Sequence, residues 1–75
     1  MNKIRRSKLI EANIYINKTL YILESIKDGE QDAFDSTPEN LQYSSRACDM
    51  ENNIENLEDA IDYINDAISC MDNVI

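Results

Sequence analysis

An apolar repeat at alternating spacings of four and three residues constrains this chain more than any other feature. The repeat comprises Met50, Ile54, Leu57, Ile61, Ile64, Ile68, Met71 and Ile75. Apolar side chains that recur roughly every 3.5 residues form one narrow stripe along an α-helix, which suits the interdigitated packing of a coiled coil. A stripe of this length must be covered by a second helix, from the same chain or from another copy. The repeat therefore predicts a long helix with a helical partner.

Length and turn content limit the fold further. The chain has 75 residues, near the size at which one hydrophobic core is barely sufficient. It contains one glycine and one proline, and it lacks histidine and tryptophan. So few turn-forming residues favour long helices over strands. We expect an all-α protein in which residues 1–75 form a single antiparallel two-helix hairpin with a structured connection, associating into a helical bundle.

The N-terminal half carries the second helical pattern. Its apolar stripe steps by three and four residues through Leu9, Ala12, Ile16, Thr19, Leu23 and Ile26, and Leu20 widens it. We expect this helix to span about residues 3–28, because Gly29 suits the left-handed residue that follows a last helical turn. Ile10, Ile14 and Tyr21 lie on a different side, and a two-helix hairpin cannot cover both sides. These three residues predict a homo-oligomer face or a surface for a dedicated partner.

The connection, residues 29–45, carries its own signals. Ser36 and Glu39 have the spacing of a capping box around Pro38, which predicts a short helical turn near 38–42. Ser44 or Ser45 is the expected N-cap of the second helix, which we place at about 46–74.

The start of the second helix is also a candidate ligand or anion site. Unpaired backbone N–H groups at a helix N-terminus favour anions, and polar side chains gather there. They are Gln42, Tyr43, Ser44, Ser45 and Arg46. Together they could hold a phosphate-bearing, nucleotide-like small molecule, which would make the protein an oligomeric small-molecule binder. The alternative is that they only cap the helix and close the hairpin.

Charge is distributed unevenly along the chain, whose net charge is −8. Residues 1–27 carry six basic and two acidic residues, whereas residues 28–75 carry thirteen acidic residues and Arg46 as their one base. Oppositely charged halves favour an antiparallel hairpin. The basic N-terminal cluster has no interleaved aromatic residues, so it does not predict direct nucleic-acid binding.

The second helix presents most of its acids on one side, opposite the apolar repeat. This acidic face consists of Glu51, Glu55, Glu58, Asp59, Asp62 and Asp66. It is a candidate partner-binding face that would meet a host protein with a basic surface, or imitate the phosphates of a nucleic acid. The alternative is a solvated helix face. No histidine or nucleophile accompanies these carboxylates, so we do not expect an enzyme. No loop would wrap a cation around them, so we expect no metal site, and no motif indicates a cofactor.

Cellular location follows from the cysteines and from hydropathy. Cys48 and Cys70 are 22 positions apart in the expected second helix. That separation is about 33 Å along a helix, whereas a disulfide needs Cα atoms within about 7 Å. No secretory signal and no membrane span is predicted. We therefore expect two reduced thiols, and we expect the protein to lie in the host-cell cytoplasm.

The residues around the connection resemble those of a known group of proteins. They are Ala33-Phe34-Asp35, Pro38-Glu39, Leu41-Gln42, Ser44, Arg46, Met50, Ile54, Leu57-Glu58 and Ala60-Ile61. The group consists of small uncharacterised acidic helical-hairpin proteins of phages, prophages and mobile elements of Gram-positive bacteria. The resemblance covers residues 33–61 and implies a mobile-element accessory protein that blocks or sequesters a host factor, such as an anti-phage defence component. A structural or assembly component is a further alternative.

Overall fold

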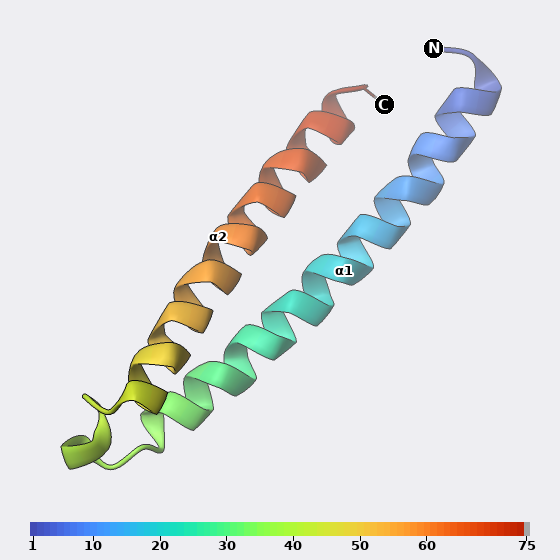
Figure 1. The fold of residues 1–75 in the computed structure, drawn as a ribbon. Coiled ribbons are helices and arrows are strands. Elements are labelled where there is room, and N and C mark those ends of the chain that lie inside the picture. Colours follow the sequence, from blue (N-terminus) through green and yellow to red (C-terminus); the bar gives the residue numbers. More distant parts are fainter. Residues whose placement is uncertain (75) are drawn as a thin grey trace.

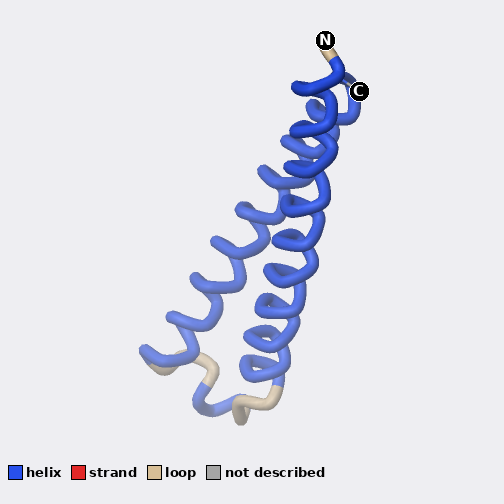
Figure 2. Tube along the Cα trace, turned by 90° about the vertical axis from the view of Figure 1, so that its right-hand side faces the viewer, coloured by secondary structure: helices blue, strands red, loops and turns tan. Residues whose placement is uncertain are grey.

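The computed structural model describes residues 1–74, which form two long antiparallel helices (Figure 1). Helix α1 spans Lys3–Asp35, the 3₁₀ turn η1 spans Glu39–Leu41, and helix α2 spans Ser45–Val74. No strand occurs among these residues, so the expected all-α hairpin is confirmed. The molecule is a rod of 59 × 15 × 13 Å, and both views place the start of α1 beside the end of α2 (Figures 1 and 2).

The helices pack through one stripe of side chains from each. In α2 the stripe is Ala47, Met50, Ile54, Leu57, Ile61, Ile64, Ile68 and Met71. Ala47 and Ile54 are the buried residues of the described chain, with 1% and 8% exposure. The repeat predicted from Met50 onward is thus the packing surface of α2, although Ile75 lies outside the described residues. The stripe of α1 is Leu9, Asn13, Ile16, Leu20, Leu23, Lys27, Glu30 and Phe34, all partly buried.

The apolar stripe predicted for α1 was wrong in part. Leu9, Ile16, Leu20 and Leu23 do face α2, but Ala12, Thr19 and Ile26 are exposed. Polar residues take the remaining positions of the stripe, and each of them reaches α2. Asn13 Nδ2 donates to Asp72 Oδ1 at 3.4 Å, Glu30 Oε2 accepts from Asn53 Nδ2 at 3.2 Å, and Lys27 Nζ lies 4.0 Å from Glu58 Oε1.

These polar contacts explain why apolarity alone misplaced the stripe. Polar residues within a helix–helix seam lower stability but restrict the register in which the helices can pair. The three contacts join the terminal end, the middle and the connection end of the hairpin. They therefore favour one antiparallel alignment over alignments shifted by a heptad.

The expected end of the first helix near residue 28 was also wrong. Helix α1 continues through Gly29 to Asp35, and Gly29 does not have a positive φ angle. A glycine inside a helix costs only about 1 kcal/mol, and the added turns place Phe34 in the stripe and Glu30 against Asn53. The helix ends instead where Pro38 disfavours helical geometry in Thr37. The connection is accordingly shorter than expected, residues 36–44.

Capping agrees with the sequence at α2 and differs at η1. Ser44 Oγ accepts a hydrogen bond from Ala47 N at 3.2 Å, so Ser44 is the predicted cap of α2. The short turn expected near 38–42 is η1. The Ser36–Glu39 capping box is absent, because no side chain caps η1 and the backbone N–H of Ser36 is engaged by Asp32 O at the end of α1.

Candidate functional site

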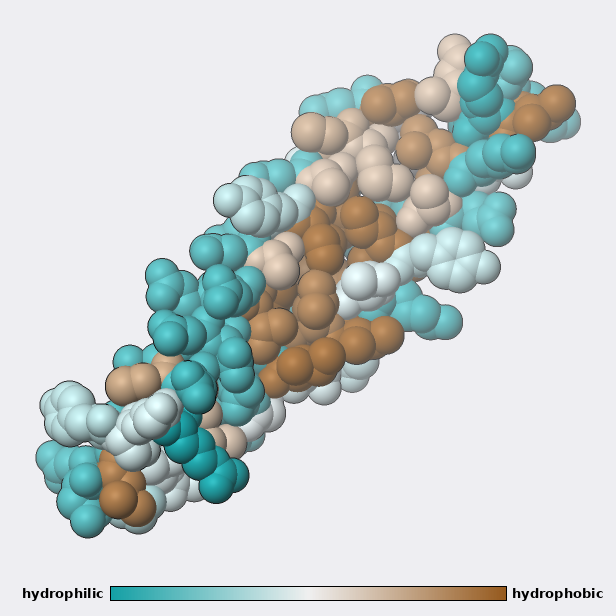
Figure 3. Space-filling model, viewed as in Figure 1, coloured by the Kyte–Doolittle hydropathy of each residue, from teal (hydrophilic) through white to brown (hydrophobic). Residues whose placement is uncertain are grey.

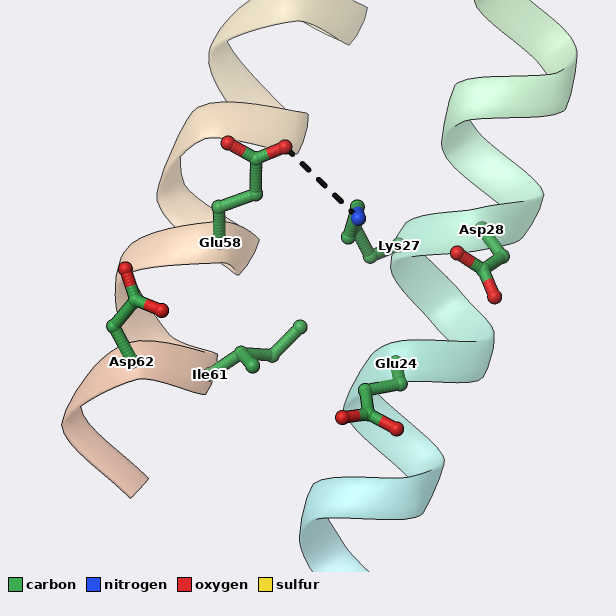
Figure 4. Close-up of a pocket in the computed structure, with 6 residues that line it drawn as sticks. All are labelled: Glu24, Lys27, Asp28, Glu58, Ile61 and Asp62. Atoms are coloured by element: carbon green, nitrogen blue, oxygen red, sulfur yellow. Dashed lines mark ion pairs between the residues drawn. The ribbon is translucent and has the colours of Figure 1, made fainter. Parts of the chain in front are cut away.

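Carboxylates from both helices surround a groove along one edge of the hairpin. The groove, about 280 Å³, is lined by Glu24, Lys27 and Asp28 of α1 and by Glu58, Ile61 and Asp62 of α2 (Figure 4). Lys27 lies opposite Glu58 and is the one cation among these six residues. Both side chains of this pair are substantially solvated, so it contributes at most about 1 kcal/mol to stability. The groove therefore keeps a strong excess of negative charge.

A second hollow extends the groove toward the connection. It has a volume of about 350 Å³ and is lined by Gln31, Phe34, Glu51, Ile54, Glu55 and Glu58. Glu58 lines both hollows, so the two are adjacent. We call the carboxylates of this surface the acidic edge. Its members are Glu24, Asp28, Glu51, Glu55, Glu58 and Asp62.

The acidic edge differs in membership from the face expected from the sequence. Glu51, Glu55, Glu58 and Asp62 belong to it, whereas the exposed Asp59 and Asp66 line neither hollow. Sequence reasoning missed Glu24 and Asp28. Their spacing of four residues places them on one side of a helix, but only the pairing of α1 with α2 shows which side.

The arrangement of these carboxylates suits an extended cationic surface better than a single ion. Within residues 1–74, no three His, Cys, Asp or Glu side chains converge on a point that could hold a metal ion. On α2 the acids of the edge recur every three or four residues, which is about 5 Å along the helix axis. Charges spread in this way can pair with successive lysine or arginine side chains on a partner.

The candidate ligand site at the connection is only partly assembled. Ser44 and Arg46 line a hollow of about 360 Å³ with Ala33, Ser36, Thr37, Pro38, Leu41, Ala47 and Met50. Gln42 instead donates to Thr37 O at 3.4 Å, and Tyr43 is 91% exposed. Neither these two residues nor Ser45 lines the hollow. The structure thus brings together two of the five expected residues, of which Ser44 already caps α2.

The remaining residues singled out in the sequence lie on the surface. Ile10, Ile14 and Tyr21 are exposed, and helical spacing places them on the same side of α1 as Glu24. They remain a predicted partner or oligomer face. Cys48 and Cys70 are both free and exposed on α2. Neither long helix, within the residues described, contains a stretch with the length and hydropathy of a membrane span.

No protein-family description, curated protein or solved structure matches the chain.

Proposed function

We propose that this chain is a non-enzymatic binding protein that presents its acidic edge to a basic surface of another protein. The observation that carries this proposal is that six carboxylates from two helices line the two adjacent hollows of one edge, whereas Lys27 is the one cation that lines either of them. Such an edge steers and holds a positively charged partner through many weak contacts. Occupying the basic surface would block or sequester the partner.

The kind of partner follows from the same geometry. A row of charges on a rigid rod resembles the phosphates of a nucleic acid, so the natural ligand of the basic surface would be DNA or RNA. The resemblance of residues 33–61 to mobile-element proteins supports a partner in the host cell. We therefore propose a phage or mobile-element accessory protein whose target is a nucleic-acid-binding host factor, with anti-phage defence proteins as the leading class.

Neutralising the acidic edge is expected to remove this binding. The test variant carries Glu51→Gln, Glu55→Gln and Asp62→Asn, which leaves the Lys27–Glu58 pair intact. Quantitative affinity purification from lysate of a Gram-positive host should show proteins that the original chain captures and the variant loses. The retained fraction should also fall as salt rises, because solvated charge pairs are screened.

A matched control separates the edge from net charge. The control carries Glu11→Gln, Asp32→Asn and Asp49→Asn, which are exposed acids that line neither edge hollow. It has the same net charge as the test variant and should keep the captured proteins. Loss of capture in both variants would show that overall charge, rather than the edge, is responsible.

A second candidate function is small-molecule binding at the connection. It is favoured by the hollow in which Arg46, Ser36, Thr37 and Ser44 lie together. If a nucleotide binds there, millimolar nucleotide should raise the melting temperature, and Arg46→Gln should abolish the increase without lowering the melting temperature of the free protein. A nucleotide panel that leaves the melting temperature unchanged at these concentrations would refute this candidate.

A further inference from the structure

Within the part of the chain that the structure describes, one face of the hairpin is made of uncharged side chains over about half its length. In α1 it consists of Ala12, Tyr15, Thr19, Ile22 and Ile26, and in α2 of Ala60, Tyr63, Ala67, Cys70 and Val74. Each set steps by three and four residues, so each occupies one side of its helix. We call the two sets together the uncharged face. Its lack of charge is notable because 29% of the chain is charged.

The two sets lie on the same side of the hairpin, away from the acidic edge. Two residues along a helix correspond to a rotation of about 200° around its axis. Ile22 and Ile26 are each two residues from Glu24, so they point away from it. In α2, Ala60 is likewise two residues from Glu58 and from Asp62. The Asn13–Asp72 and Lys27–Glu58 contacts show that both sets occupy the same length of the rod. Figure 3 views this side, and apolar residues gather there over the middle of both helices.

The hairpin exposes more surface than a compact protein of this mass. Its accessible surface is 5744 Å² for 8.7 kDa, whereas compact proteins of that mass expose about 4,700 Å². The radius of gyration is 17.2 Å, against about 11 Å for a compact chain of this length. The excess of about 1,000 Å² is similar to the roughly 800 Å² that each partner contributes to a stable interface.

We propose that the uncharged face is covered by the same face of a second copy, forming a four-helix dimer. Among residues 1–74 only two are buried in the single hairpin, so the cover has to be present whenever the chain folds, and a second copy meets that condition. Two chains of charge −8 repel each other through their acidic edges, whereas on the uncharged face the charged side chains, such as Asp59 and Asp66 beside Tyr63, lie only at the margin. Its alanines allow the helices to approach closely.

This dimer is independent of the proposed function, because both acidic edges remain on the outside of the bundle. It also differs from the oligomer face predicted by the sequence. Ile10, Ile14 and Tyr21 lie on the other side of α1, the side that bears Glu24.

Two matched pairs of substitutions distinguish the faces. Ile22→Glu and Tyr63→Glu alter the uncharged face, and Ile14→Glu and Tyr21→Glu make the same changes elsewhere. In the single hairpin Ile22 and Ile14 are 52% and 62% exposed, and Tyr63 and Tyr21 are 74% and 73% exposed. Light scattering should give twice the 8.7 kDa chain mass for the original protein and both control variants. It should give the single-chain mass for Ile22→Glu and Tyr63→Glu.

Thiol reactivity tests the dimer without any substitution. Cys70 lies on the uncharged face and Cys48 lies outside it, yet both are exposed in the hairpin. A maleimide should modify Cys70 more slowly than Cys48, and the difference should shrink on dilution. The proposal would be overturned if the original protein were monomeric or if the two thiols reacted equally at high concentration. It would also be overturned if Ile14→Glu and Tyr21→Glu, rather than the substitutions on the uncharged face, broke the dimer.

Discussion

Replacing Ile54 by alanine is expected to lower the free energy of unfolding by about 2–5 kcal/mol. Ile54 is 8% exposed and is the one large side chain buried among the described residues. Its removal leaves a cavity where α2 packs against the end of α1. Small domains have total stabilities of only about 5–15 kcal/mol, and a chain with so little buried surface belongs at the lower end. Much of the protein should therefore unfold at 37 °C.

Urea denaturation, followed by the helical circular-dichroism signal at about 222 nm, measures this loss of stability. Ile14→Ala is the matched control, because Ile14 is 62% exposed on α1. Surface substitutions of this kind change stability by about 0.5 kcal/mol or less. If the two alanine variants unfold at the same urea concentration, Ile54 is not the centre of the hairpin core.

Replacing Gly29 by proline is expected to cost at least about 3 kcal/mol. Gly29 lies inside α1, where a proline would remove one backbone hydrogen bond and clash with the carbonyl of Ser25. The turns that carry Glu30 and Phe34 would be displaced from α2. If the first helix ended instead at Asp28, with Gly29 in the left-handed conformation, proline would also be disfavoured there, because its ring holds φ at about −65°. The melting temperature of this variant measures the loss, and the alanine variant at the same position tests the length of α1.

Gly29→Ala is the corresponding control. No atom outside the local helix backbone lies within 4 Å of the position that its Cβ would occupy. Alanine is the better helix former by about 1 kcal/mol, so this variant should be slightly more stable than the original protein. A clearly destabilising alanine would indicate instead that the chain turns at Gly29 with a positive φ angle, where any side chain is strained.

The outcome at α1 shows which parts of the hairpin could be predicted. The apolar repeat of α2 and its N-cap serine follow from side-chain periodicity and hydrogen bonding within a few residues of each position, whereas the end of α1 just before Pro38 was not predicted. In α1, three of the eight stripe positions are polar, namely Asn13, Lys27 and Glu30, and the exposed Ile26 is as apolar as the partly buried Leu23. No local rule could choose between the two sides.

The candidate site shows the same limit. Glu51, Glu55, Glu58 and Asp62 were predicted because they share one side of a single helix. Glu24 and Asp28 were missed because their place beside Glu58 depends on how two helices pair across the hairpin. Gly29 was misinterpreted for a related reason. The helix continues through it because Glu30 and Phe34 pack against α2, and the hydrogen-bond partner of Glu30, Asn53, lies more than twenty residues away along the chain.

The sequence by itself determined that the chain forms two long helices and which side of α2 is covered, because helix formation and amphipathicity depend on residues three or four positions apart. Only the tertiary structure decided which side of α1 meets α2, how far α1 continues, and which carboxylates share an edge. Those features depend on the register in which the two antiparallel helices pair. Polar contacts between the helices, such as Lys27–Glu58, favour that register, and the residue pattern of one helix alone does not specify it.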